Sequence, residues 1–394
     1  RYSVFPASSS PMSASLSSVT ELLQALIQVP SVNPVGAPKS DHTGEAACAE
    51  FVGRFLEEHC GATVHYDEVE PGRPNVIGKL TAGDSGSGKP RILFAPHTDT
   101  VSVAGMTIDP FGGEIRDGKI WGRGASDTKG TMAAMLWAFV ELKDRLPELN
   151  AEVSFVGLMG EETGQPGSQH FGEKYRGGYD FCIVGEPTEL DVVYTHKGCT
   201  WVDLIAGGHA CHGASPERGE NAITKLLPVI QAIDTELRAE LAQFESPVLG
   251  SATVNIGQLH GGSRTNIVPD ECVASLDFRE TPELAAAGGA VGKLGDLLQR
   301  HGWADEIAVR APVQTRPLDT DIQNPFVQTL LGLGVDPVGA PWFCDAAWLA
   351  EIGDIPSVAC GPGSIAQAHT KDEWLKVEDL EAGVAFYRRF LEAL

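Results

Sequence analysis

Six side chains of this sequence combine ligand chemistry with positions that suggest a shared centre. Imidazole nitrogens and carboxylate oxygens are the donor atoms that zinc and similar divalent metals bind. Two such metals side by side lower the pKa of a water molecule and so create a nucleophile at neutral pH. The pattern therefore predicts a two-metal hydrolase centre. The residues are His97, Asp127, Glu161, Glu162, Glu186 and His369.

Short apolar runs precede most of these residues. Runs of this length with glycine after them are typical of buried parallel strands. In open α/β sheets, ligands collect beyond the carboxyl ends of the strands. We therefore expect the six side chains to converge at one edge of a sheet. The runs are Ile92–Ala95 before His97, Val153–Met159 before Glu161 and Glu162, Phe181–Val184 before Glu186, and Ser357–Cys360 before the loop to His369.

The residues next to His97, Asp127 and the Glu161–Glu162 pair suggest further roles in this centre. Asp99 follows His97 by two residues and can orient the imidazole of a metal ligand through a hydrogen bond. Asp127 lies in a glycine-rich turn into a helix, where it caps the helix, bridges two metals, or does both. Glu161 and Glu162 point in different directions after a strand, so one can bind metal while the other faces the attacking water. A solvated surface pair is the alternative for these two glutamates.

Bulk properties limit the classes of protein. At 394 residues the chain exceeds the roughly 250–300 residues at which single cores stop growing, so we expect more than one domain. The formal charge of −24 argues against nucleic acid and anionic membranes as partners. It fits a well-solvated acidic surface or adaptation to salt. No apolar stretch is long enough to cross a bilayer. The eight scattered cysteines suit a reducing cytoplasm.

The order of elements predicts an α/β protein with a helix-covered, mostly parallel sheet. Strands and helices alternate up to Glu186. From His196 the order becomes β-α-β-β-α-β, with long helices expected at 221–244 and 282–301. This order is typical of a ferredoxin-like unit. We therefore expect a catalytic domain in two parts, 12–195 and 311–394, and an inserted α+β lid or dimerisation domain at 196–310. Residues 1–11 are expected to be a remnant outside the native chain, with Met12 as its start.

Two further motifs carry weaker hypotheses. Residues 83–89 nearly form a phosphate-binding loop, but Pro90 stands where Ser or Thr is required. A nucleotide-dependent enzyme would rest on this motif alone. A zinc site formed by His209, Cys211 and His212 is a further hypothesis, but no second ligand cluster lies near them in sequence. A structural or surface role is the default interpretation for either histidine taken alone.

Taken together, the motifs resemble those of the M20 family of metallopeptidases and amidohydrolases. Within that family the sequence is most similar to the branch of acetylornithine deacetylase and succinyl-diaminopimelate desuccinylase. The resemblance covers nearly all of residues 12–394. The motifs that carry it are HTDTV at 97–101, GRGASDTKG at 122–130, GEE at 160–162, GEPT at 185–188, HKG at 196–198, CHGASPERGENAI at 211–223, NIVP at 266–269, DFR at 277–279 and GPGSIAQAHTKDEW at 361–374.

The resemblance implies a role for each matching residue. Two zinc ions, for which cobalt can substitute, would share Asp127, and the peptide bond after Asp127 would be cis. Glu161 would be the general base and Asp99 the residue that orients a ligand. His212 would act across a homodimer in the partner's site. The implied ligands are His97, Asp127 and Glu186 for one zinc and Asp127, Glu162 and His369 for the other; the implied substrate-binding residues are Asn266, Arg279, Gly361 and Gly363.

These observations lead to one preferred function and several alternatives. We expect a cytoplasmic di-zinc hydrolase that cleaves the amide bond of a small N-acyl amino acid, with N-acetylornithine as first choice. A desuccinylase, or a dipeptidase-like or carboxypeptidase-like exopeptidase, is the alternative within the same class. A metal-free binding homologue that kept the fold is the alternative from a different class. The role of Asp345, in the turn Phe343–Asp345, is left open.

Overall fold

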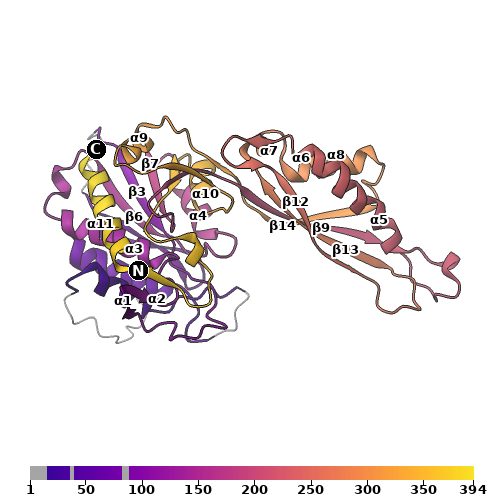
Figure 1. Ribbon diagram of the computed structural model, residues 1–394, viewed down its shortest axis with the longest axis horizontal. Helices are drawn as coiled ribbons and strands as arrows, with labels where there is room; N and C mark the ends of the chain where they lie inside the picture. The colour runs from indigo at the N-terminus through magenta and orange to yellow at the C-terminus, as the bar shows by residue number, and fades with distance from the viewer. Residues whose placement is uncertain (1–15, 36–39, 82–87) are drawn as a thin grey trace.

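The computed structural model describes residues 16–35, 40–81 and 88–394. Residues 1–11 and most of the loop at 83–89 lie outside this part of the chain, so the predictions made for them are not addressed. Figure 1 shows two lobes of unequal size, connected near the start of β9 and the end of β14. Within the described residues, every helix falls short of the length and hydropathy that crossing a membrane requires.

The larger lobe is built on a mixed sheet that has nine strands within the described residues. Its central strands β6, β3, β7 and β17 are parallel. The pairs β1–β2, β2–β6, β17–β8 and β8–β15 are antiparallel. The α/β class is thus confirmed, with parallel pairing concentrated at the centre. The strands, in spatial order, are β1 Thr63–Glu70, β2 Arg73–Lys79, β6 Glu152–Gly157, β3 Arg91–Pro96, β7 Phe181–Gly185, β17 Ser357–Ala359, β8 Val192–His196 and β15 Leu318–Asp319, with β16 Pro337–Ala340 beside β8.

Helices cover both faces of this sheet because its central strands are apolar on both faces. In β3, Phe94 packs into one hydrophobic cluster and Leu93 into another. The first cluster includes residues of α1, α2, α3 and α11, and the second includes residues of α4 and α10.

A small sheet joins β4 Glu114–Arg116, β5 Lys119–Trp121 and β18 Trp374–Lys376. The helices are α1 Val19–Ile27, α2 Ala46–Phe55, α3 Lys129–Leu142, α4 Pro166–Lys174, α9 Pro325–Leu331, α10 Ala346–Glu351 and α11 Val377–Glu392, with short helical turns at Leu56–Cys60, Leu146–Glu148 and Ile365–Gln367.

The smaller lobe is an antiparallel sheet with helices on one face. Its strand order is β12–β13–β9–β14, and the chain follows the expected β-α-β-β-α-β sequence. Both expected long helices are interrupted. A π-helical turn at Ile233–Leu237 divides the first, and Gly288 and Gly289, both with positive φ, divide the second. The elements are β9 Gly198–Gly207, α5 Ala222–Ala232, α6 Arg238–Leu241, β12 Thr253–Gly261, β13 Glu271–Glu280, α7 Pro282–Ala286, α8 Gly289–Arg300 and β14 Ile307–Gln314, with a short turn at Pro216–Arg218 and a small hairpin of β10 Glu245–Ser246 and β11 Gly250–Ser251.

The two connections between the lobes contact each other. Cys199 and Thr315 exchange backbone and side-chain hydrogen bonds of 2.8 Å. Gly198 lies so close to the other connection that a Cβ there would meet Thr315 O at 2.6 Å and Pro317 N at 2.8 Å. The paired strands thus reach from Gly198 to Gln314, four residues beyond the predicted end of the insert at 310. The division into domains remains a prediction.

Gly198→Ala tests this close contact. Because the added methyl group meets backbone atoms that cannot rotate away, we expect a loss of roughly 1–3 kcal/mol in the free energy of unfolding. Denaturant unfolding of the full chain measures it. Gly207→Ala, at the other end of the same strand, is the matched control, since a Cβ there meets nothing within 4 Å. Equal stability of both variants would contradict the expectation.

Candidate metal centre

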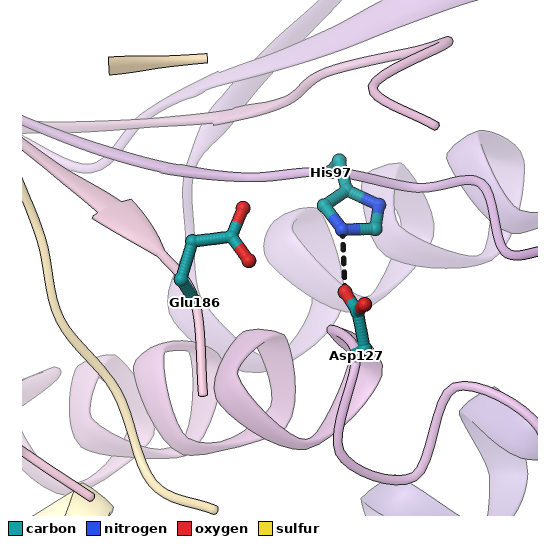
Figure 2. Close-up of side chains that lie close together, drawn as sticks. All are labelled: His97, Asp127 and Glu186. Carbon is teal, nitrogen blue, oxygen red and sulfur yellow. Dashed lines mark hydrogen bonds and ion pairs between the residues drawn. The ribbon is translucent and has the colours of Figure 1, made fainter. Parts of the chain in front are cut away.

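A first group of potential metal ligands joins the ends of two central strands to the start of α3. His97 follows β3, Glu186 follows β7, and Asp127 precedes α3. One ligand atom from each of the three lies within 4.8 Å of the others. His97 Nε2 is 2.9 Å from Asp127 Oδ1, and Figure 2 shows the Glu186 carboxylate to the left of the imidazole ring and Asp127 below it. All three side chains are buried, so any charge held here is shielded from solvent.

A second group shares Asp127 with the first. It adds Glu162, after β6, and His369, from the loop that follows β17. His369 Nε2 lies 2.9 Å from Glu162 Oε2 and 3.4 Å from Asp127 Oδ2. One oxygen of Asp127 thus faces His97 and the other faces His369. The peptide bond between Asp127 and Thr128 is cis, as the resemblance implied.

Asp99 was expected to orient the His97 imidazole through its carboxylate, but its backbone oxygen makes the closer contact. His97 Nδ1 is 2.9 Å from the backbone oxygen of Asp99 and 3.5 Å from its carboxylate. The carboxylate instead accepts the backbone N–H groups of Glu161 and Glu162, at 3.0 and 3.1 Å, and the side-chain amide of Asn33 at 2.7 Å. Asp99 therefore fixes the imidazole through its main chain and the two glutamates through its side chain. The contribution of Asn33 was not predicted from the sequence.

Glu373 is a second residue that the sequence interpretation missed. This buried carboxylate accepts Arg123 Nη1 at 2.8 Å. It also accepts the backbone N–H groups of Gly124, Ser126 and Asp127, at 3.0, 2.8 and 2.9 Å. The glycine-rich turn that presents Asp127 is thus wrapped around one charged group. The acidic residue in the 361–374 motif was a visible signal, but its partner lies about 250 residues away in the chain.

Acidic neighbours raise the pKa of both histidines of the centre. Burial opposes protonation of His97, but its hydrogen bonds with Asp127 and Asp99 raise its pKa well above the usual value. Hydrogen bonds with Asp127 and Glu162 raise the pKa of His369 to about 10. Although burial acts in the other direction, the same two histidines lower the pKa of Asp127.

The neighbouring glutamates repel one another. Burial, followed by the charge of Asp127, raises the pKa of Glu162 to about 7 and that of Glu186 well above normal. Burial and the charge of Glu186 raise the pKa of Glu161. Within the described residues, Glu162 Oε1 and Glu186 Oε1 are buried and accept no hydrogen bond. A compact set of carboxylates with free oxygens fits divalent cations, which supply the positive charge that the set lacks.

Asp345 lies close to this cluster. It precedes α10 and is fully buried, and burial raises its pKa to about 7. Its charge adds to the raised pKa of both Glu161 and Glu186. Asp345 therefore belongs to the electrostatic surroundings of the centre; the sequence predicts its turn near the pocket and leaves only its role open.

The predicted substrate residues divide between two places. Gly361 and Gly363 lie beside the centre, where a Cβ would meet Glu186 O at 2.7 Å and Ser126 Oγ at 2.7 Å, respectively. Gly363 also lines a cavity of about 360 Å³ together with Glu189 and Trp374. His212, Asn266 and Arg279 belong to the smaller lobe, and neither of the two ligand groups found among the described residues includes them.

Comparison with known proteins identifies the family. The sequence pattern of the peptidase family M20/M25/M40 matches residues 93–393, most of the chain. The chain belongs to this family. It is a metal-dependent hydrolase that acts on amide bonds.

Relatives within this family carry different names. A probable carboxypeptidase of Aspergillus flavus is 32% identical over 398 residues, which cover 94% of this chain and 88% of the relative. An acetylornithine deacetylase of Aliivibrio fischeri is 26% identical over 382 residues, with coverage of 93% and 96%. The crystal structure of an M20 family metallo-carboxypeptidase of Sulfolobus solfataricus has the same fold. Its TM-score is 0.74 at 21% identity, covering 96% of this chain and 99% of that one.

Glu373→Gln tests the support beneath Asp127. Glutamine has the same shape, but its NH2 group faces N–H donors that a carboxylate accepts. We expect metal affinity to fall roughly 10- to 100-fold, as for other residues that orient metal ligands. Calorimetric titration of metal-free protein with Zn²⁺ measures this. Asp372→Asn is the matched control, since Asp372 accepts hydrogen bonds from exposed Thr107. Unchanged affinity in Glu373→Gln would contradict the assignment.

Proposed function

We propose that the protein is a di-zinc amidohydrolase that cleaves a small N-acyl amino acid. The observation that carries this proposal is the shared Asp127, whose two oxygens face two separate ligand groups. His97 and Glu186 would complete one site, and Glu162 and His369 the other. Cobalt would substitute for zinc, because both accept the same nitrogen and oxygen ligands.

Glu161 would be the base of the reaction. A pair of zinc ions supplies an activated water molecule and polarises the amide carbonyl. Glu161 would take a proton from the attacking water and later deliver it to the departing amine. Two observations support this role. Glu161 belongs to neither ligand group, so its carboxylate is free to act on the water. Its backbone N–H donates to Asp99, the same carboxylate that accepts the N–H of Glu162. Burial beside Glu186 raises its pKa, and a raised pKa suits a group that must both take and return a proton.

His212 would donate a hydrogen bond to the oxyanion that develops on the substrate. The backbone N–H of Ala214 donates to His212 Nδ1 at 3.1 Å. In the neutral ring the proton therefore sits on Nε2, which is left to donate. Asn266 lies beside it, because the backbone of Ile267 pairs with His212 and Gly213 N donates to Asn266 O. We propose that these two residues contact the substrate together.

The position of this pair favours a homodimer. His212 and Asn266 lie at one end of the small sheet, next to the start of β13, whereas Arg279 lies at the end of β13 near the connections between lobes. From Cys272 to Arg279 an extended strand covers roughly 20 Å. One small substrate cannot contact both ends in one chain. We propose that Arg279 binds the substrate carboxylate in its own subunit and that His212 and Asn266 serve the partner's site.

The substrate proposal has one alternative with specific support. N-acetylornithine is our first choice because of the motif resemblance and the deacetylase relative. The probable carboxypeptidase of Aspergillus flavus, at higher identity, favours a carboxypeptidase-like exopeptidase as the second candidate. Both substrates have an amide bond near a free carboxylate, which Arg279 would bind through charge-assisted hydrogen bonds.

We also propose a cytoplasmic location, because all eight cysteines are unpaired.

Assays of zinc-loaded protein against N-acetylornithine, N-succinyl-diaminopimelate and simple dipeptides test the proposed reaction. We expect fastest release of acetate from N-acetylornithine. Glu161→Gln should bind as much zinc but lose roughly 10²- to 10⁴-fold in kcat, because the proton carrier is gone. Wild-type turnover in that variant would refute the role of Glu161. Failure of the wild-type protein to bind zinc would refute the proposed centre. Preferred cleavage of dipeptides would establish the alternative substrate.

Mixing two inactive variants tests the role of His212. Glu161→Gln and His212→Ala each disable their own homodimer. After subunit exchange, a mixed dimer contains one site with an intact Glu161 and an intact His212 from the partner. If His212 acts across the dimer, we expect recovery to about one quarter of wild-type activity in an equimolar mixture of symmetric dimers. No recovery, with mixed dimers demonstrated by mass spectrometry, would place His212 in its own subunit's site.

A further inference from the structure

One oxygen of the Glu161 carboxylate is held by the side chain of Gln165. Gln165 Nε2 donates to Glu161 Oε1 at 2.8 Å. Gln165 is fully buried, and its own amide oxygen has no hydrogen-bond partner among the described residues. A buried amide normally satisfies both of its polar ends. The hydrogen bond to Glu161 is therefore the contact that explains why a glutamine is buried at this position.

The main chain of Gln165 is held in an unusual conformation. Its φ of 56° and ψ of 42° place it in the left-handed region, which favours glycine or asparagine. Gln165 N donates to Gly160 O at 3.0 Å, and Ser168 Oγ donates to Gln165 O at 3.1 Å. Pro166 follows as the first residue of α4. Strained backbone positions of this kind cluster at functional sites, so the conformation motivates a functional hypothesis for the side chain.

We propose that Gln165 is a positioning residue that orients the base Glu161. The inference rests on the proposed function of Glu161. An amide suits this task because it donates a hydrogen bond without exchanging its proton with the base. With Oε1 engaged by Gln165, Oε2 is the oxygen that takes the proton from the attacking water. The backbone of Glu161 is fixed by Asp99 and the carboxylate by Gln165, so the side chain is held at both ends.

A second glutamine, in the helix that begins directly after Gln165, provides a matched control. Gln169 Nε2 donates at 2.7 Å to the backbone oxygen of Gly164, within the loop that carries the glutamates. This bond supports the loop but does not contact the carboxylate. The same change, glutamine to methionine, at each position therefore separates support of the loop from orientation of Glu161.

The experiment compares Gln165→Met and Gln169→Met in the zinc-loaded full chain, with the substrate that wild-type protein cleaves fastest. Methionine keeps the length of glutamine and removes the donor. We expect Gln165→Met to lower kcat roughly 10- to 100-fold, the range for a misplaced reacting group, while KM and zinc content stay within about twofold of wild type. Gln169→Met should retain wild-type kcat.

Several results would overturn the proposal. Unchanged kcat in Gln165→Met would do so, as would an equal loss in Gln169→Met, which would indicate support of the loop alone. A crystal structure of Gln165→Met gives a test that needs no substrate. There we expect Glu161 to leave its wild-type rotamer while Glu162 and His369 stay in place; an unmoved Glu161 would contradict the inference. If wild-type protein cleaves none of the substrates, the proposed function fails, and the rotamer still decides whether Gln165 positions Glu161.

Discussion

The carboxylate of Asp127 is the contact on which the rest of the centre depends. Its two oxygens face two imidazoles that come from different parts of the chain, one after β3 and one after β17. A carboxylate that serves the two proposed cation sites would have to be held rigidly, because small displacements would change both sites together. Glu373 meets this need by accepting the backbone N–H groups on the turn that presents Asp127. A buried acid thus stabilises the position of another buried acid through the main chain between them.

The loop carrying the glutamates is fixed by the same kind of contact. Asp99 accepts two of its backbone N–H groups, and Asn75 on β2 binds both ends, accepting Met159 N at 3.0 Å and donating to Gly167 O at 2.9 Å. Side-chain oxygens and amides of neighbouring strands thus substitute for regular secondary structure in this loop. The negative charges of Glu161, Glu162 and Glu186 are thereby held close together, and divalent cations bound there would offset their repulsion.

The smaller lobe places a different constraint on the protein. Its sheet extends away from the centre, and the loops with His212 and Asn266 lie at the far end. A site that needs donors from these loops cannot be completed by a single rigid chain of this shape. The proposed homodimer answers this requirement, with Arg279 near the connections and the two loop residues reaching a second subunit.

The sequence alone predicted the five candidate ligand residues that the structure groups together, and it predicted the order of the elements. Most of these candidate ligands follow short apolar runs, and Asp127 lies in a glycine-rich turn. Because such features are local, spacing and residue type were sufficient to select the residues. The β-α-β-β-α-β order of the smaller lobe was predicted for the same reason. Only the tertiary structure decided which strands pair antiparallel at the edges of the large sheet and where the two long helices break. It also decided that Glu373, Asn33 and Gln165 contact residues of the centre, since these contacts depend on the path of the chain in space. Glu373 and Asp127, for example, are 246 residues apart.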